Sequence, residues 1–196
     1  AATIRVPADA VEGNSVDAHS SYIVESFPGL VEKRCGTLVL FSSKRQMEQV
    51  YDELDRDQQK EIIMQGQFSN REMVRLHKER VDQGRTSVLM GLASFAEGVD
   101  LPGDYCRHVV IAKLPFAVPD DPLHEALSEW VEAKGGNSFF DISLPIASLR
   151  LIQACGRLLR TESDTGTVTI LDKRLITKRY GGQLLNALPP FRREIG

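Results

Sequence analysis

The chain has 196 residues, of which 42% are hydrophobic and 26% are charged, and its formal net charge at pH 7 is -3. This composition is typical of an ordinary soluble globular protein, and the length fits one sizeable domain better than two very small ones. The negative net charge excludes a broadly basic coat for nucleic acid, although it leaves room for a local basic groove.

Short runs of strand length recur along the chain, at residues 3–6, 37–41, 61–64, 86–90, 108–112 and 167–171. Most of them are rich in apolar residues, as in strands that are covered on both faces. Segments with helical spacing lie between them, at residues 15–33, 47–54, 70–83, 121–134 and 143–160. We expect Pro28 and Gly29 to interrupt the first helix, and Ser69 or Asn70 to cap the third. This alternation predicts an α/β fold with a mainly parallel sheet.

The cysteines and the ends of the chain narrow the class of protein further. Cys35, Cys106 and Cys155 are far apart and form no CxxC pair, so they indicate neither a metal site nor a disulfide framework. No apolar run approaches the roughly 18 residues that span a bilayer, and residues 1–7 lack the pattern of a signal peptide. We expect a cytoplasmic protein that does not bind a membrane. The absence of an initiating Met favours a fragment of a longer protein.

The last predicted helix has two chemically distinct faces. On a helical wheel one side carries Gln153, Gly156, Arg157 and Arg160, and the other side carries Leu151, Ile152, Cys155, Leu158 and Leu159. Two guanidinium groups one turn apart can straddle a polyphosphate, because each offers a planar fork of donors. The alternative is an amphipathic surface helix whose arginines are merely solvated.

Polar groups follow several of the predicted strands. They are Ser42-Ser43-Lys44, the loop Gly91–Gly103, Lys113 and Asp172. Ligands of open parallel sheets bind outside the carboxyl ends of the strands, so we expect these groups to share one edge. Three glycines in the loop would allow positive φ and close approach of backbone N–H groups, and Glu97 and Asp100 add two carboxylates. A glycine-rich loop of this kind is also common as a purely structural connection.

The loop and the two-faced helix together carry a family resemblance. Residues 91–103 read GLASFAEGVDLPG and residues 153–160 read QACGRLLR, with TLVLFSS at 37–43 and KLPF at 113–116. The first two segments resemble motifs V and VI of superfamily 2 helicases. The four sequences together are most similar to those of the DinG branch of the XPD-type DNA helicases. The resemblance covers about Thr37 to Arg193. It implies a second RecA-like motor lobe, with its sheet sandwiched between helices, at residues 37–196. Residues 1–36 would supply a strand and a helix that lead into the lobe, in one structural domain overall.

The resemblance also implies roles for individual residues. Arg157 and Arg160 would reach the ATP γ-phosphate as arginine fingers, and Gln153 would sense the same phosphate. The nucleotide edge would be formed by Glu97, Gly98 and Asp100. The residues facing a translocating single strand of DNA would be Ser42, Ser43, Lys44, Ser94 and Phe95.

The same resemblance sets the expected cofactors and partners. The chain has no G-x-x-x-x-G-K-[ST], so ATP and Mg²⁺ would be held mainly by a first RecA-like lobe, and the chain alone should not hydrolyse ATP. An iron-sulfur cluster is expected in the full-length protein and no metal in this chain. The partners would be single-stranded and forked DNA and the first lobe, for a monomer acting at the bacterial nucleoid.

Two other classes of function stay open. One is a RecA-like module that binds nucleic acid or protein without catalysis, and the other is an unrelated Rossmann-type nucleotide binder, which the lack of a G-x-G-x-x-G disfavours. Among smaller features, His19, His77, His108 and His124 have no partner at ligand spacing and are interpreted as satisfied or solvated. Trp130 is interpreted as a core residue, whereas Phe95 and Phe116 could stack on bases. Arg192 and Arg193 are interpreted as tail charges. Asp172 would either brace the arginine helix or cap the next one.

Overall fold

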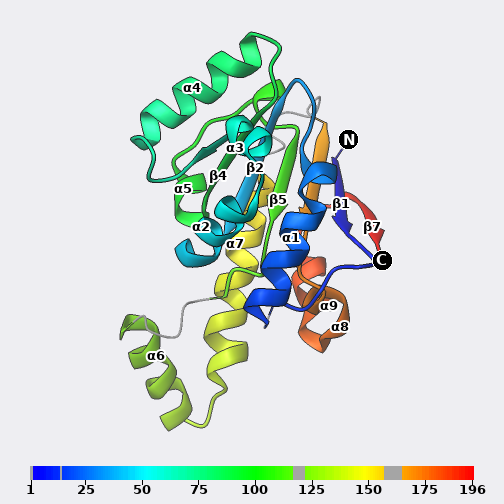
Figure 1. The fold of residues 1–196 in the computed structure, drawn as a ribbon. Helices are drawn as coiled ribbons and strands as arrows, with labels where there is room; N and C mark the ends of the chain where they lie inside the picture. Colours follow the sequence, from blue (N-terminus) through cyan, green and yellow to red (C-terminus); the bar gives the residue numbers. More distant parts are fainter. Residues whose placement is uncertain (1, 14, 117–121, 157–164) are drawn as a thin grey trace.

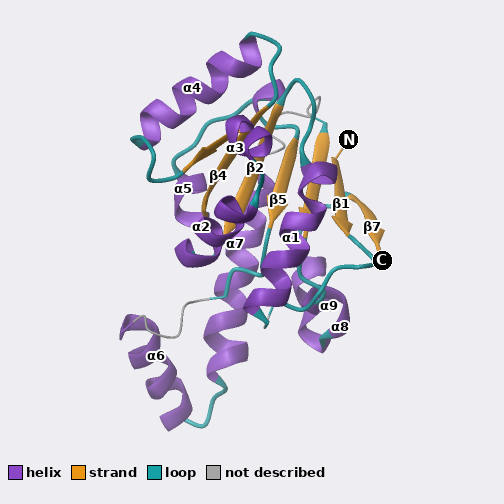
Figure 2. Cartoon of the chain, in the orientation of Figure 1, coloured by secondary structure: helices purple, strands orange, loops and turns teal. Residues whose placement is uncertain are grey.

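The chain folds around a parallel sheet with helices on both sides (Figures 1 and 2). The structure is a computed structural model, and it describes residues 2–13, 15–116, 122–156 and 165–196. Its strands are β1 Ala2–Val6, β2 Gly36–Phe41, β3 Ile62–Met64, β4 Ser87–Leu92, β5 His108–Ile111, β6 Gly166–Ile170 and β7 Arg192–Ile195. The strand order is β3-β4-β2-β5-β6-β1-β7, and every pairing between them is parallel. The predicted α/β fold with a mainly parallel sheet is confirmed.

The helices lie mainly between consecutive strands. They are α1 Val16–Leu30, α2 Lys44–Glu53, α3 Arg56–Glu61, α4 Asn70–Asp82, α5 Ala93–Glu97, α6 Pro122–Ala133, α7 Leu144–Gly156, α8 Arg174–Thr177 and α9 Arg179–Ala187, with a 3₁₀ turn η1 at Gly103–Tyr105 and a π-helical turn η2 at Phe139–Ser143. Of the two predicted caps of α4, Ser69 is the one observed: its hydroxyl oxygen accepts a hydrogen bond from the Glu72 N–H at 3.2 Å.

Alternate residues of the central strands supply two separate cores. Leu38 and Leu40 of β2 pack in the first cluster with Leu151 and Cys155 of α7. Val39 and Phe41 pack in the second cluster, with residues of α1 and α2 that include Ile23, Phe27 and Met47. Successive side chains of a strand point to opposite faces, so a strand that is buried throughout must be covered twice. α7 therefore covers one face of the sheet, and α1 and α2 cover the other.

Two sequence-based expectations about local structure are wrong. Helix α1 runs through Pro28 and ends at Leu30, so this proline does not interrupt it. Pro28 lies in the last turn, where the loss of one N–H removes only one helical hydrogen bond. Arg192 and Arg193 are not tail charges, because they belong to β7 and pair with Thr3 and Ile4 of β1. β7 is an edge strand, where exposed charges are tolerated and discourage pairing with other chains.

Helix α6 stands apart from the sheet and packs against η2 (Figure 1). Trp130 of α6 is 58% exposed, which corrects the interpretation of this residue as core. The Nζ atom of Lys134 lies 4.1 Å from the centre of its ring. The apolar side chains of this helix share an outward face with Trp130, because Leu123 and Leu127 are also exposed. Their helical spacing is genuine, but it marks a face that the sheet does not cover.

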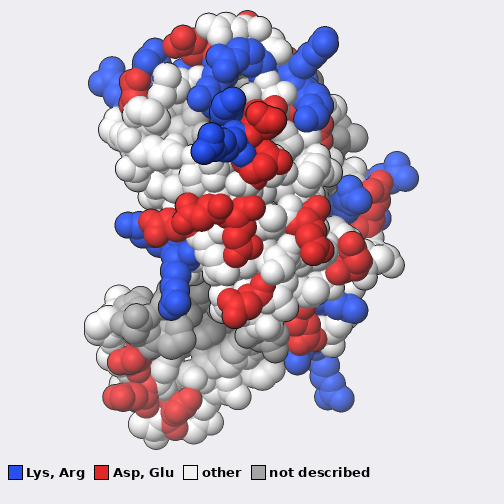
Figure 3. All heavy atoms as spheres, viewed as in Figure 1, with Lys and Arg blue, Asp and Glu red and all other residues white. Residues whose placement is uncertain are grey.

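Charge is unevenly spread over the surface that Figure 3 shows. Basic side chains gather at the end of the molecule formed by α4, whereas α6 carries acidic ones, at Glu125, Glu129 and Glu132. This face therefore has no continuous basic coat, in keeping with the negative net charge. In the part of the chain that the structure describes, no helix is long and apolar enough to cross a membrane.

Candidate functional site

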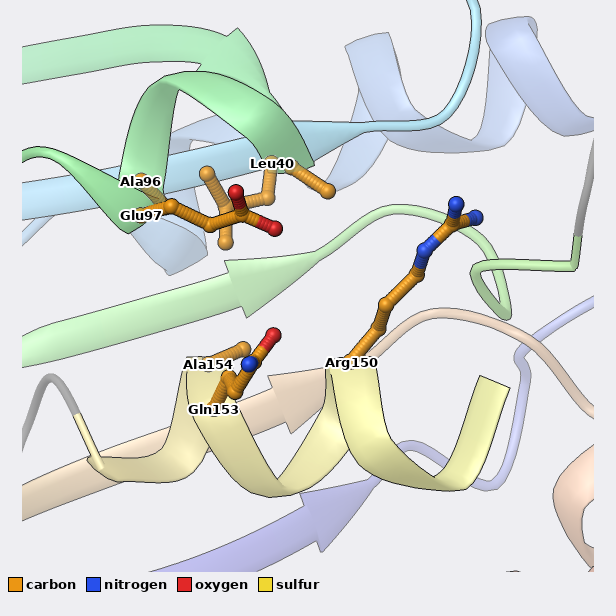
Figure 4. Close-up of a pocket in the computed structure, with 7 residues that line it drawn as sticks. Leu40, Ala96, Glu97, Arg150, Gln153 and Ala154 are labelled. Carbon is orange, nitrogen blue, oxygen red and sulfur yellow. The ribbon is translucent and has the colours of Figure 1, made fainter. Parts of the chain in front are cut away.

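A groove between α5 and α7 brings together residues that are far apart in sequence (Figure 4). Its floor and walls are small or apolar, and three polar side chains line it: Glu97 of α5 and Arg150 and Gln153 of α7. Figure 4 shows the side chains of Glu97 and Gln153 turned toward the same space, while Arg150 extends toward the end of β5. The groove therefore joins the loop after β4 to the predicted two-faced helix.

The described part of α7 has the two faces that its sequence predicts. Leu151 and Cys155 are fully buried against the sheet, and burial raises the pKa of the Cys155 thiol to about 12, so it is not a nucleophile near neutral pH. Gln153 and Gly156 are exposed on the other side, and a Cβ at Gly156 would meet no other segment of the described chain within 4 Å. The two predicted arginine fingers, Arg157 and Arg160, lie outside the described residues.

The predicted strand-end groups meet at one edge of the sheet. β4, β2, β5 and β6 are consecutive neighbours, and the chain leaves them at α5, Ser42, Ala112 and Leu171, followed by Lys113 and Asp172. Ser43 caps α2, since its hydroxyl oxygen accepts from the Gln46 N–H at 3.3 Å. The Nζ atom of Lys44 is exposed and lies 3.9 Å from the Glu48 carboxylate, an ion pair that solvent weakens. Ser43 and Lys44 are thus accessible at the start of a helix.

The loop between Gly91 and Gly103 is partly helical, because α5 occupies its first half. Ser94, Glu97, Gly98 and Asp100 are exposed there. Of the three glycines, only Gly103 has a positive φ, of +60°. Gly91 is needed for another reason: a Cβ at this position would lie 2.7 Å from Cδ1 of the Phe95 ring. The expectation of positive φ therefore holds at one glycine, and close packing explains another.

The Phe95 ring is 2% exposed and belongs to the core beneath α5. It cannot stack on a base or face a DNA strand in this structure, which corrects that part of the predicted DNA track. The cause is the short helix, which turns Phe95 toward the sheet and leaves Ser94 outward. Phe116 also packs internally, with its ring centre 5.5 Å from Phe139 and 5.8 Å from Tyr180.

Asp172 is a fully buried junction between three segments. Its carboxylate accepts from the N–H groups of Gly13 at 3.2 Å, Leu114 at 3.0 Å and Arg174 at 3.1 Å, and from the Arg174 guanidinium at 2.6 Å. Burial alone would raise the pKa of Asp172, but these hydrogen bonds outweigh it and hold the pKa below its usual value. Its bond to the Arg174 N–H lies at the start of α8, but the N-cap residue of this helix is Lys173, which makes no side-chain cap, so Asp172 does not act as the predicted cap. None of the bonds described here reaches α7.

The buried histidines are all hydrogen-bonded within the protein. His19 bonds the Leu171 carbonyl and Gln46, His77 bonds Ser87 and the Tyr105 carbonyl, and His108 bonds the Leu30 carbonyl and Thr169. Burial lowers the pKa of all three, to about 4 for His77 and His108. These contacts fit the interpretation of satisfied histidines. Among the described residues no group of three His, Cys, Asp or Glu side chains could hold a metal ion.

Comparisons with known proteins identify the family of the chain. Residues 30–191 match the family described as "Helicase C-terminal domain", and the chain belongs to this family. It is 43% identical over 197 residues to the "ATP-dependent DNA helicase DinG" of Photobacterium profundum, and 43% identical over 182 residues to that of Escherichia coli K12. These matches cover 99% and 90% of the chain but only 28% and 25% of the relatives. The predicted resemblance to the DinG branch is confirmed.

Solved structures support the fold. The chain superposes on an "XPD_Helicase" structure with a TM-score of 0.70 at 20% identity, covering 100% of the chain and 35% of that structure. It also resembles the C-terminal domain of the DEAD-box protein Dbp5, with a TM-score of 0.54 at 17% identity over 98% of the chain and 89% of that domain. The predicted RecA-like lobe is therefore confirmed. The chain spans about a quarter of the curated relatives it matches.

Arg150 is the groove residue that sequence reasoning missed. It precedes Gln153 by three residues, so the two side chains lie on neighbouring turns of one helix face. This spacing was a usable signal in the sequence. It is the tertiary structure that reveals the target of the guanidinium, because Nη1 donates to the Pro115 carbonyl at 3.2 Å, just beyond β5.

Proposed function

We propose that this chain is the second motor lobe of an ATP-dependent superfamily 2 DNA helicase that unwinds DNA by translocating on single strands. The observation that carries the proposal is the α5–α7 groove, which holds Glu97 and Gln153 side by side. In the sequence, Gln153 shortly precedes Arg157 and Arg160. Opposed polar groups on two elements of one lobe suit a surface that closes on a nucleotide bound by another lobe. The family membership and the DinG relatives support the same reading.

In this proposal Arg157 and Arg160 act as arginine fingers on the γ-phosphate, and Gln153 contacts the same group. Glu97, Gly98 and Asp100 form the nucleotide edge. Ser42, Ser43, Lys44 and Ser94 contribute to the DNA track, and Phe95 supports it from below through its buried ring. The first lobe of the full-length protein holds ATP and Mg²⁺ and carries the iron-sulfur cluster, and the substrate is single-stranded or forked DNA. The protein works as a cytoplasmic monomer, in which residues 1–196 form a single domain.

The arginines provide the direct test. In the full-length protein Arg157→Ala and Arg160→Ala should each lower ATP turnover by roughly 10³ or more, because the charge that develops on the γ-phosphate loses its stabilisation. DNA binding should be largely retained, and the double variant should be little worse than either single one. Arg56→Ala, on the exposed helix α3, is the matched control and should behave as wild type. Near-normal turnover and unwinding in both finger variants would exclude this role.

The isolated chain provides a second test, of the proposal that ATP and Mg²⁺ are held by the first lobe. It should show no ATPase activity with or without single-stranded DNA, because its sequence contains no phosphate-binding loop. DNA-stimulated turnover by the purified chain that Arg157→Ala abolishes would contradict the proposal.

A further inference from the structure

Arg150 lies where the α5–α7 groove opens onto the carboxyl edge of the sheet. It lines the groove with Glu97 and Gln153, and it also lines a neighbouring hollow with Ser42, Lys113 and Pro115. Ser42 directly follows β2, Lys113 and Pro115 lie in the segment that leaves β5, and Ala93, which lines both hollows, directly follows β4. A single side chain of α7 thus reaches the ends of neighbouring strands.

The charge of Arg150 is not balanced by the described part of the protein. The residue as a whole is partly buried, and its guanidinium donates to a neutral carbonyl oxygen, that of Pro115. Arg174, at the same edge, is paired with the Asp172 carboxylate at 2.6 Å, and Arg75 is paired with Glu72 and Glu79. Among the described carboxylates, none forms such a pair with Arg150. A partly desolvated cation with spare donors is well placed to bind an external anion.

We propose that Arg150 binds a backbone phosphate of single-stranded nucleic acid at this edge. The inference rests on the proposed function, and it extends the track beyond the serines and lysine that follow β2. Ser42 lines the same hollow, and its hydroxyl is a further donor for the same phosphate. The hydrogen bond to Pro115 leaves most of the five guanidinium donors available and fixes the orientation of the fork.

Arg150 is also mechanically coupled to Gln153, because both residues lie on α7. Arg150 and Gln153 are one turn apart on a helix whose opposite face is fully buried, so they move together with α7. Any displacement of α7 would therefore move Gln153 and the phosphate held by Arg150 together. The residue is a binding residue for the strand and a link between the strand and the nucleotide side of the lobe.

The test compares Arg150→Gln with Arg150→Lys in the full-length protein. Glutamine keeps an N–H donor for the Pro115 carbonyl but removes the charge, whereas lysine keeps the charge. Affinity for a labelled oligothymidylate is measured by fluorescence anisotropy across a salt series. Arg150→Gln should weaken binding about tenfold at low salt and reduce the slope of log K against log salt by about 0.7, the value for one phosphate of a single strand. Arg150→Lys should retain the slope.

The other phosphate that Arg150 could bind is that of a nucleotide. ATPase kinetics distinguish nucleotide phosphate from the backbone phosphate of a single strand. Arg150→Gln should raise the oligothymidylate concentration that half-maximally stimulates turnover by about tenfold, while the KM for ATP changes less than twofold. Arg56→Ala serves as the control for both measurements. A rise in the KM for ATP without a change in salt slope would overturn the assignment, and so would wild-type binding by Arg150→Gln. If the wild-type protein itself fails to bind single strands or to be stimulated by them, it is the proposed function that fails.

Discussion

The contact between α1 and the sheet differs sharply from the groove between α5 and α7, although both contain polar side chains. Around α1, His19, His108 and Asp172 are buried and bonded to partners inside the protein. In the groove, Glu97 and Gln153 are exposed and Arg150 keeps donors to spare. Buried polar groups must be satisfied internally because their desolvation is costly, so the first set stabilises the fold. Polar groups that are exposed to solvent can instead bind a ligand.

Removal of the Asp172 carboxylate should have the largest effect on the α1 side. We expect Asp172→Ala to destabilise the purified chain by about 3–5 kcal/mol, since it leaves Arg174 as a buried charge without its partner. Urea unfolding followed by circular dichroism measures the loss. Asp104→Ala is the matched control, because Asp104 also pairs with a nearby arginine, Arg107, but at an exposed site, where about 0–1 kcal/mol is expected. Equal effects of the two substitutions would remove the distinction between buried and open pairs.

Acidification should also destabilise the fold through its buried histidines. The pKa of His108 is about 4 in the fold, against 6.5 for an unperturbed histidine, so the folded state favours the neutral ring. Its contribution is fully present above pH 6.5 and is lost as the pH falls toward 4, by about 2 kcal/mol between pH 7.5 and pH 5. His77 adds a similar loss, because its pKa is also about 4.

Unfolding free energies measured at pH 7.5, 6 and 5 provide the check. His108→Gln should be less stable than wild type at pH 7.5 and should lose less stability on acidification. A wild-type chain whose stability does not change between pH 7.5 and pH 5 would show that these rings are not held neutral.

The groove should respond in the opposite way, with a loss of activity at nearly constant stability. In the full-length protein Gln153→Ala should lower ATP turnover by about 10², a typical effect of removing one donor to a transition state. In the isolated chain it should change the free energy of unfolding by less than about 0.5 kcal/mol, because the side chain is exposed. Gln49→Ala, on α2, is the control and should alter neither quantity. Strong destabilisation by Gln153→Ala would place this residue with the structural groups.

The candidate site was predictable to the extent that it is encoded locally. The serines after β2, the acidic loop after β4 and the face of α7 that carries Gln153 were all found from strand ends and helical spacing. Arg150 and the burial of Phe95 were not, because both depend on contacts between elements. The guanidinium of Arg150 is oriented by its hydrogen bond to Pro115, 35 residues away, and the ring of Phe95 is buried by the sheet beneath α5.

The sequence by itself determined the alternation of strands and helices, the start of α4 at Ser69 or Asn70 and the helicase motifs, since each depends on residues a few positions apart. Only the tertiary structure decided which apolar face is buried and which polar group has a partner. It leaves Trp130 of α6 exposed, makes β7 from Arg192 and Arg193, and joins Asp172 to Gly13 across 159 positions. The physical reason is that burial and hydrogen bonding are properties of the packed chain, where segments distant in sequence cover one another.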